Sequence, residues 1–493
     1  MGDFMLNKNI DTNIKVVDDA FSNWGDIVKR KIYIGENKDR AIFVCYIDDM
    51  ADRGLIEDTV LHSLMVDIRL TEPNIDTYSF KTLLDGGVTT ADIKFADTIT
   101  EAIDEVMVGN GMLLVEGFEN AVIISAKGFP HRGVEKPENE VAVLGAKEAF
   151  AESIRVNTVL IRRRIRDTAL KCEQMTVGTK SKTDVALMYM KDTVREEVLE
   201  ETKKRLKAID IEAVLDCGYL EQYMEDNKNS PFPQVQLTER PDKVAAELLE
   251  GRVAVIADGS PFVMLAPAVL ASFYQASEDY YQRWEIMTFV RIIRYLAGFI
   301  AFALPGLYIA VTLYQPSMIA GELAYKIAGA RKTVPIPTAA EVIFLEIAFE
   351  ALREAGIRLP SSIGSTLGVV GGIIIGQAAV EAGLVSPMVV IVVALTGICS
   401  FAVPNIPLTS AYRLIKYVLI FLSIFFGVYG WFLGIILVLT HICSLKSFGI
   451  PYIYPFGAAG SLSELRDSFI RAPLYKMKKS IFNRRVKKHY KGS

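Results

Sequence analysis

The sequence has little histidine and little cysteine, and neither occurs in a pattern that carries chemistry. None of its four histidines has a nucleophile or a metal ligand at a useful spacing. The five cysteines are scattered, without a CxxC or Cys/His motif, as is typical of free thiols in a reducing compartment. These absences predict no catalytic residue, no metal site and no cofactor, so the chain is not expected to be an enzyme.

A signal peptide is also lacking. The start, MGDFMLNKNI, has neither a basic beginning nor an apolar core, so we expect residues 1–290 to remain cytoplasmic. The formal net charge of −4 hides a strong segregation of charge, because residues 464–493 carry ten Lys/Arg against two acids. This basic tail is expected to be cytoplasmic as well.

Two parts of the N-terminal half share one order of elements. AIFVCYIDDM (41–50) and VALMYMKDTV (185–194) are predicted buried strands, each followed by an amphipathic helix, at 54–65 in the first copy. Residues 112–124 and 254–265 each predict a strand, a tight acid-Gly turn and a returning strand. Both pairs are offset by 142–143 residues, which predicts a tandem duplication of an α/β subdomain. The alternative is chance similarity between common patterns.

Between the two copies, residues 145–170 predict one long helix with a basic cluster. Arginine forms bidentate bonds to phosphate and binds lipid headgroups, so the cluster is a candidate for either contact; a solvated or subunit-facing surface is the alternative. No aromatic residues are interleaved with it and no DNA-reading motif occurs, so nucleic-acid binding is not expected. The cluster consists of Arg162, Arg163, Arg164 and Arg166.

Long apolar stretches dominate the C-terminal half. Residues 292–314 are long enough to span a hydrocarbon core of ~30 Å, and 363–383 and 386–404 are further predicted spans. The run 417–445 is too long for one comfortable crossing. It either turns over at Gly427–Gly430 or forms one tilted helix.

Glycines recur at every fourth position in the span 363–383. Such a face has no side chains, so another helix backbone can approach it closely. The glycines predict a helix-packing surface, unless they reflect only the general tolerance of membrane helices for glycine. They are Gly364, Gly368, Gly372 and Gly376.

The stretch EVIFLEIAFEALREAGIRLP (341–360) is apolar enough to enter a bilayer but carries four glutamates. On a helix Glu346, Glu350 and Glu354 lie within about 80° of one another, with Glu341 at their flank, so the carboxylates form one stripe. Because a carboxylate in hydrocarbon costs several kcal/mol, the stripe must face protein, water or headgroups. It suits a cation-attracting vestibule or pore.

In the same stretch, Glu350 is expected to pair with Arg353 at i,i+3. If both termini are cytoplasmic, the number of crossings is even. Six crossings include the glutamate helix, whereas four leave it lying in the membrane interface with its acids in water. The six-crossing topology is preferred, although it places Lys326, Arg331 and Lys332 outside.

The expected fold is therefore an α/β N-terminal cytoplasmic region, with the tandem duplication, followed by an all-α polytopic membrane domain. The expected boundaries are 1–35 for an N-terminal extension, 36–135 for the first α/β subdomain, 136–174 for a linker helix, 175–288 for the second subdomain, 289–447 for a transmembrane domain of four to six helices, and 448–493 for a basic cytoplasmic tail.

The chain contains six long and specific blocks: SIRVNTVLIRRRIRD, GTKSKTDVALMYMKD, LTERPDKVAAELLEGRVAVIADGSPFVML, SEDYYQRW, EIAFEALREAGIRLPSSIG and GQAAVEAGLVSPMVVIVVALTGICSFAVP. These blocks resemble the signature blocks of the GerA-family spore germination proteins, the A subunits of germinant receptors in endospore formers. The resemblance covers roughly residues 35–475. SpoVAF-type paralogues share two of the blocks and remain a close alternative. Residues 144–150, LGAKEAF, depart from the family's common RGPKEGF.

The resemblance implies a protein of the spore inner membrane that acts in germination. Its implied partners are a transporter-like B subunit, a lipoprotein C subunit, membrane lipid and further copies of itself. A subunits of this family are thought to form a ring that conducts ions when the receptor is activated. A non-conducting scaffold or signal relay of the germination complex is the alternative.

Overall fold

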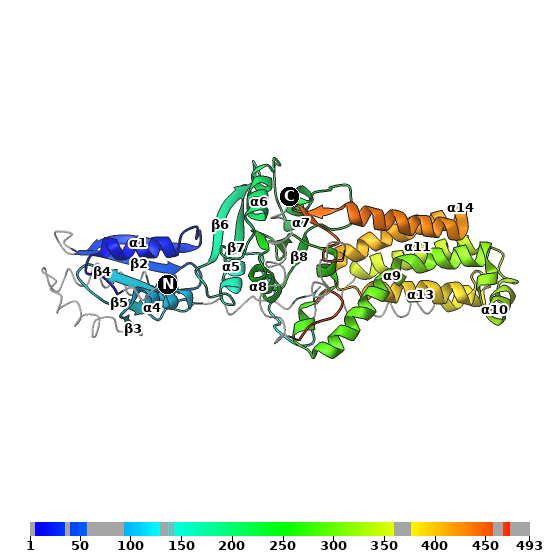
Figure 1. Cartoon of the computed structure of the whole chain (residues 1–493), viewed down its shortest axis with the longest axis horizontal. Helices are drawn as coiled ribbons and strands as arrows, with labels where there is room; N and C mark the ends of the chain where they lie inside the picture. Colours follow the sequence, from blue (N-terminus) through cyan, green and yellow to red (C-terminus); the bar gives the residue numbers. More distant parts are fainter. Residues whose placement is uncertain are drawn as a thin grey trace. The chain divides into compact units, whose positions relative to one another are not determined.

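The computed structural model describes residues 5–34, 40–56, 93–128, 137, 140, 142–358, 376–456 and 467–473. They form two compact units (Figure 1). The N-terminal unit holds the described residues up to Met224 together with Val235–Pro267. The helical unit holds Glu225–Gln234 and the described residues from Ala268 onward.

The first half of the N-terminal unit is a five-stranded antiparallel sheet with the strand order β1-β2-β4-β5-β3. Alternate residues of β2 point to opposite faces, and both faces are buried. Helices α1 and α4 cover one face with their apolar sides. The elements are α1 (Ile10–Ala20), β1 (Ile27–Ile34), β2 (Arg40–Ile47), β3 (Ile93–Ala96), α4 (Ile99–Met107), β4 (Gly111–Val115) and β5 (Ala121–Ile124).

The second half repeats this plan with the order β6-β7-β9-β10-β8, which confirms the duplication. Both predicted acid-Gly turns are present, with Gly117 at φ +85° and Gly259 at φ +82°, values that favour glycine. The predicted helix at 54–65 extends beyond the described residues. The elements are α5 (Ile154–Arg162), β6 (Leu170–Val177), β7 (Thr183–Met190), α6 (Glu196–Lys207), α7 (Cys217–Met224), β8 (Gln236–Thr238), α8 (Pro241–Leu249), β9 (Val253–Ala257) and β10 (Val263–Ala266).

The single long helix predicted at 145–170 is wrong. Helix α5 has only nine residues, and β6 already begins at Leu170. The Asn157 side chain accepts a hydrogen bond from Ala151 N and donates one to Ala151 O, which holds the preceding chain out of the helix. The residues from Leu170 onward join the second sheet instead, since Leu170 pairs with Met190. Tertiary contacts thus override a sequence pattern that suits a helix.

The predicted boundaries also move. Residues 1–35 are not a separate extension, because α1 and β1 are part of the first sheet and its core. The boundary at 174 falls inside β6, the edge strand of the second sheet. The main part of the helical unit begins at Ala268, not at 289, and the unit also includes Glu225–Gln234.

Among the helices with described bounds in the helical unit, four lie side by side and a short one lies at one end of them (Figure 1). The four are α9 (Trp284–Tyr314), α11 (Thr338–Arg358), α13 (Pro387–Phe401) and α14 (Ile406–Ser444), and the short one is α10 (Gly321–Arg331). The smaller elements are the 3₁₀ helices η3 (Leu270–Tyr274), η4 (Ser277–Tyr280) and η5 (Pro316–Met318) and the two-stranded β11 (Lys446–Ser447) and β12 (Ile450–Pro451).

Helices α11 and α13 run in the same direction. Near their starts Glu341 accepts a hydrogen bond from Ser386 N, and further along Arg353 donates to Ser400 Oγ. The end of α11 and the start of α13 therefore lie at opposite ends of the bundle. With 21 residues α11 is about 31 Å long, enough to cross a hydrocarbon core. By length and composition together α11 does not qualify as a membrane span, so its crossing stays a prediction.

Helix α14 is a hairpin of two helical arms. Gly427 has φ 59° and ψ −139°, a conformation that breaks the helix. Gly430 lies against Leu422 and Gly434 against Leu419, contacts that a straight helix cannot make across so many residues. The sequence allowed either one tilted helix or a turn at Gly427–Gly430 in residues 417–445, and the structure has the turn.

Replacing Gly427 with alanine is expected to destabilise the helical unit by about 1–3 kcal/mol, because its backbone conformation strains any other residue. An added Cβ would also lie 2.8 Å from the Tyr314 ring. Chemical unfolding of the full chain in detergent measures the change. Gly329→Ala in α10 is the control, since nothing lies within 4 Å of its Cβ and alanine favours a helix. Equal destabilisation by Gly427→Ala and Gly329→Ala would contradict the assignment of Gly427 as the turn between the two arms of α14.

Candidate functional site

The carboxylate stripe of α11 faces the first arm of α14. Lys416 Nζ donates to Glu346 Oε2 at 2.5 Å, and Arg413 NH1 donates to Glu350 Oε1 at 2.6 Å. Two acids four residues apart on α11 thereby meet two bases three residues apart on α14. We refer to these two contacts as the α11–α14 ion pairs.

The two pairs differ in exposure. The side chains of Glu346 and Lys416 are 1% and 6% exposed, whereas those of Glu350 and Arg413 are 33% and 31% exposed. In the described part of the chain, Glu346 Oε1 and Glu350 Oε2 have no hydrogen-bond partner. The row thus combines one fully buried pair with one that reaches the surface, and each acid keeps one buried oxygen without a hydrogen-bond partner.

Glu341 has a different role from the rest of the stripe. It is fully buried, and its Oε2 accepts from Ser386 N at 2.7 Å, at the N-terminus of α13. The helix dipole favours a negative charge at that position. Arg331 lies 3.7 Å away on the other carboxylate oxygen. Glu341 is therefore a helix-capping anion and is not placed to attract a cation.

The predicted pair of Glu350 and Arg353 is replaced by other partners. Glu350 binds Arg413, and Arg353 donates to Ser400 Oγ at 2.6 Å, because neighbouring helices offer better-placed groups than the next turn of α11. Glu354, the last acid of the stripe, is exposed.

Sequence reasoning missed Arg413 and Lys416 as site residues and treated them only as charges that orient the chain. A signal was present: two bases three residues apart at the edge of an apolar run. Ionisable residues in such a position are expected to find charged partners. The identity of those partners depends on which helices pack together.

Three of the four predicted packing glycines, Gly364, Gly368 and Gly372, lie outside the described residues. Gly376 is buried, and an added Cβ would lie 3.3 Å from Val390 Cγ1, so an alanine here would require the Val390 side chain to shift by a few tenths of an ångström.

The predicted basic surface cluster is wrong for Arg162. This side chain is fully buried; it makes a bidentate ion pair with Asp26, one arm of which is 2.7 Å long, and it stacks on Trp24. Arg163 and Arg164 both bind Glu148, and Arg166 is exposed. The four guanidinium groups do not form one patch, because successive residues at the end of a helix point in different directions.

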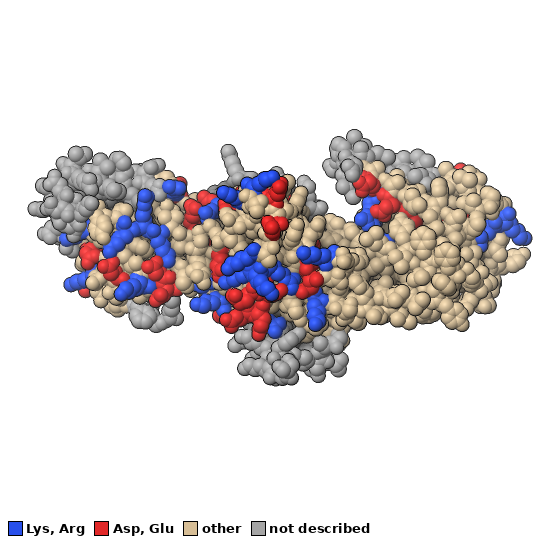
Figure 2. Space-filling model, turned by 90° about the horizontal axis from the view of Figure 1, so that it is seen from above, with Lys and Arg blue, Asp and Glu red and all other residues tan. Residues whose placement is uncertain are grey.

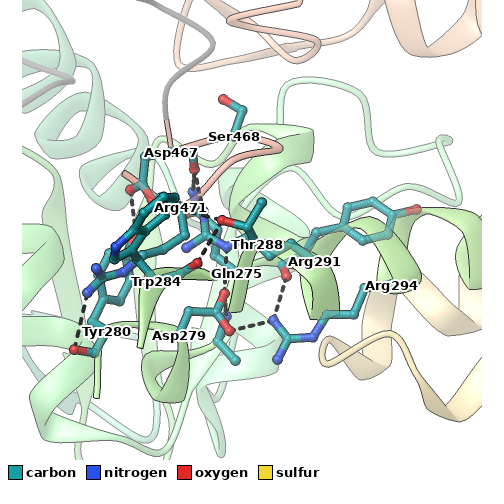
Figure 3. A network of polar contacts seen from close by, with 12 residues as sticks. Gln275, Asp279, Tyr280, Trp284, Thr288, Arg291, Arg294, Asp467, Ser468 and Arg471 are labelled. Carbon is teal, nitrogen blue, oxygen red and sulfur yellow. Dashed lines mark hydrogen bonds and ion pairs between the residues drawn. The ribbon is translucent and has the colours of Figure 1, made fainter. Parts of the chain in front are cut away.

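A second polar network fixes the start of α9 (Figure 3). Asp279, from the SEDYYQRW block, accepts from Arg291 Nε and from Arg294 NH1, both at 2.7 Å. Arg291 NH1 also donates to the carboxylate and the carbonyl of Asp467, at 2.8 and 2.7 Å. Arg291 and Asp279 are fully buried, so this network ties residues 467–471 to α9.

Among the groups outside the long apolar helices, burial shifts the pKa values of Glu225 and Lys171. It raises the pKa of Glu225 to about 6, against a hydrogen bond from Gln234 N that favours the charged form. It lowers the pKa of Lys171 to about 8, and nearby cations act in the same direction. Lys171 Nζ donates to Ala20 O at 3.1 Å.

The surface of the helical unit is apolar. Figure 2 shows few charged side chains on it, whereas both signs are densely mixed over the sheets. Large exposed apolar side chains line α9, α13 and both arms of α14. In the part of the chain that the structure describes, α9 and α14 are long and apolar enough to cross a membrane, and α13 is a shorter apolar helix.

Comparison with known proteins agrees with these features. Residues 15–481 match the model of the family described as Bacillus/Clostridium GerA spore germination protein. Spore germination protein KA of Bacillus subtilis (strain 168) is 39% identical over 470 residues, which are 95% of this chain and 85% of that protein. Spore germination protein GerLA of Bacillus cereus is 35% identical over 95% of this chain and 94% of its own length.

Two further relatives are a membrane protein of Bacillus subtilis and a solved N-terminal domain. The uncharacterized membrane protein YfkQ of Bacillus subtilis (strain 168) is 39% identical over 96% of this chain and 90% of its own length. The crystal structure of the N-terminal domain of the A subunit of the Bacillus megaterium spore germinant receptor GerK3 is 35% identical, with a TM-score of 0.44 over 55% of this chain and 99% of that one. The match to the family model over nearly the whole sequence decides the assignment: this chain belongs to the GerA family of spore germination proteins.

Proposed function

We propose that this chain is the A subunit of a germinant receptor in the spore inner membrane and that copies of it assemble into a nutrient-gated, cation-conducting channel. Its N- and C-terminal regions then face the spore core, and its partners are a transporter-like B subunit and a lipoprotein C subunit. The names of the relatives support the receptor role, and the α11–α14 ion pairs support conduction.

The ion pairs are the observation that carries the proposal. Charged groups in a membrane bundle are expensive and are usually retained for function. Glu346 with Lys416 could serve stability alone, but Glu350 and Arg413 are about one-third exposed and Glu354 is exposed beyond them. An exposed acidic edge on a helix of the bundle suits the wall of a cation path between subunits. The glycine face at 364–376 remains a proposed packing surface for the ring.

The proposed topology has six crossings. Helices α9, α11 and α13 and the two arms of α14 supply five. The sixth is the span predicted at 363–383, most of which lies outside the described residues. Helix α10, which follows α9 in the chain, then lies on the side opposite the start of α9.

Ion selectivity of the reconstituted, complete receptor tests the proposal. A carboxylate acting on a passing cation at a half-exposed site contributes about 1 kcal/mol, so Glu350→Gln should lower the preference for K⁺ over Cl⁻ roughly fivefold. Glu381→Gln is the matched control, since Glu381 is an exposed helical acid that contacts Gln377. An unchanged reversal potential in Glu350→Gln and Glu354→Gln would show that these two acids do not line the cation path.

A non-conducting scaffold is the second candidate, and the pairing of two acids with bases favours it, because paired charges attract ions weakly. The oligomeric state of the full chain in detergent discriminates the two. A ring of several copies fits the channel, whereas a stable monomer contradicts a pore formed by this chain.

A further inference from the structure

A ten-residue segment of the N-terminal half belongs to the helical unit. Residues Glu225–Gln234 pack there, although the chain on both sides, α7 up to Met224 and the stretch that begins at Val235 and enters β8, is part of the N-terminal unit. We call residues 225–234 the coupling segment. Within the described residues, the chain passes between the two units after Met224, after Gln234 and after Pro267.

The coupling segment is fixed to the chain that follows α14. Ser447 Oγ donates to Gln234 O at 2.6 Å, and Phe448 N donates to the Asp226 carboxylate at 2.7 Å. Within the segment, the Gln234 side chain closes a loop by accepting from Asn227 N and donating to Asn227 O, both at 2.8 Å. The segment is therefore a small rigid body rather than a loose connector.

Phe232 is the apolar anchor of the segment. It is 1% exposed, and its ring lies among those of Tyr412, His441 and Tyr452, with centroid distances of 6.3, 5.9 and 6.4 Å. Next to it, Ser230 Oγ and His441 Nε2 are 2.8 Å apart. Tyr412 is near the start of the first arm of α14 and His441 near the end of the second. The segment therefore closes the open end of the α14 hairpin.

Tyr412 connects this anchor to the proposed site. It is buried, it shares a hydrogen bond with Tyr274 and its ring packs against Phe302. The next residue is Arg413, and Lys416 follows one turn later on the same helix. A rotation or shift of the first arm at Tyr412 therefore moves both bases of the α11–α14 ion pairs, because a helix moves as a stiff rod and a packed core shifts between discrete arrangements.

We propose that the coupling segment relays the state of the N-terminal unit to the α11–α14 ion pairs through Phe232 and Tyr412. This inference rests on the proposed function, since it assigns the regulation of that site. A strain on β8, which starts two residues after Gln234, reaches Phe232 along a few bonds of chain. A change in the Phe232 contacts then shifts the arm that holds Arg413 and Lys416.

Hydrogen exchange of the full chain in lipid nanodiscs tests the relay without requiring conduction. In Phe232→Ala, exchange in 408–420 and in 341–354 should rise at least about tenfold, because a buried aromatic contact is lost and the arm opens more often. Phe232→Leu should give a smaller rise in the same peptides. Phe273→Ala is the control, since Phe273 belongs to the same apolar cluster but its ring lies against that of Tyr452.

A second variant separates relay from loss of packing. In a Lys416→Met background one ion pair is absent, so adding Phe232→Ala should change exchange in 341–354 by much less than it does in the wild type. Equal, additive changes in both backgrounds would overturn the relay. So would a rise in the Phe273→Ala control as large as in Phe232→Ala.

Potassium efflux from proteoliposomes that hold the full chain distinguishes this inference from the proposed function. If the chain conducts, Phe232→Ala should change basal efflux at least several-fold while the Phe273→Ala control does not. If the wild-type chain conducts nothing but exchange responds as expected, the relay stands and the channel proposal fails. If efflux is normal and exchange in 341–354 is unaffected by Phe232→Ala, the relay fails and the channel proposal stands.

Discussion

Replacing Lys416 with methionine is expected to destabilise the helical unit by about 3–5 kcal/mol. The Glu346 carboxylate is 1% exposed and has Lys416 as its ion-pair partner. Methionine fills much of the same space but leaves the carboxylate buried without a countercharge. Chemical unfolding of the full chain in detergent, with exchange of α11 and α14 as a local probe, measures the loss.

The double variant Lys416→Met/Glu346→Gln should recover most of that stability, because it removes the unpaired charge as well as its partner. Lys326→Met in α10 is a matched control, since Lys326 is exposed and should change stability by less than about 0.5 kcal/mol. A double variant as unstable as the single one would show that Lys416 acts through packing of its side chain and not through the charge pair.

Replacing Arg162 with methionine is expected to cost the N-terminal unit a similar amount, about 3–5 kcal/mol. Its guanidinium and the Asp26 carboxylate are 0% and 2% exposed, and the pair links α5, between the two sheets, to the turn before β1. The Trp24 ring covers the guanidinium at 3.4 Å from its centroid. The variant therefore leaves Asp26 charged and buried and also removes a stacking contact. Unfolding of the N-terminal unit within the full chain is the measurement.

Arg162→Lys should restore little, because an ammonium group offers neither the bidentate geometry nor the flat face. The matched control is Arg166→Met, four residues further along and exposed, with an expected change below about 0.5 kcal/mol. Similar losses in both methionine variants would show that the four arginines act together as one charged surface, as the sequence alone suggested.

The two predictions concern residues whose roles the sequence did not reveal. Arg162 stands in a run of arginines that is typical of a surface, yet its partner Asp26 is 136 positions away. Lys416 and Glu346 are 70 positions apart. Ion pairs of this kind depend on which elements pack together. Local reasoning finds i,i+3 and i,i+4 partners, and for Glu350 it found the wrong one.

The sequence by itself determined the duplication, the acid-Gly turns and the division into sheets and apolar helices. Each of these depends on local patterns: alternation in strands, glycine at positive φ, and long apolar runs. It also identified the family, since the signature blocks are long. The sequence alone did not decide whether the chain turns at Gly427, because a glycine permits a break in a helix without requiring one.

Only the tertiary structure decided where α5 ends, which acids of the stripe are paired, and that residues 225–234 belong to the helical unit. The physical reason is the same in each case. Buried charges and polar groups must find partners, and the packing of distant elements decides which partners are within reach. The stripe Glu346, Glu350 and Glu354 was visible in the sequence, but only the packing of α14 against α11 decided that Glu346 and Glu350 are paired with bases.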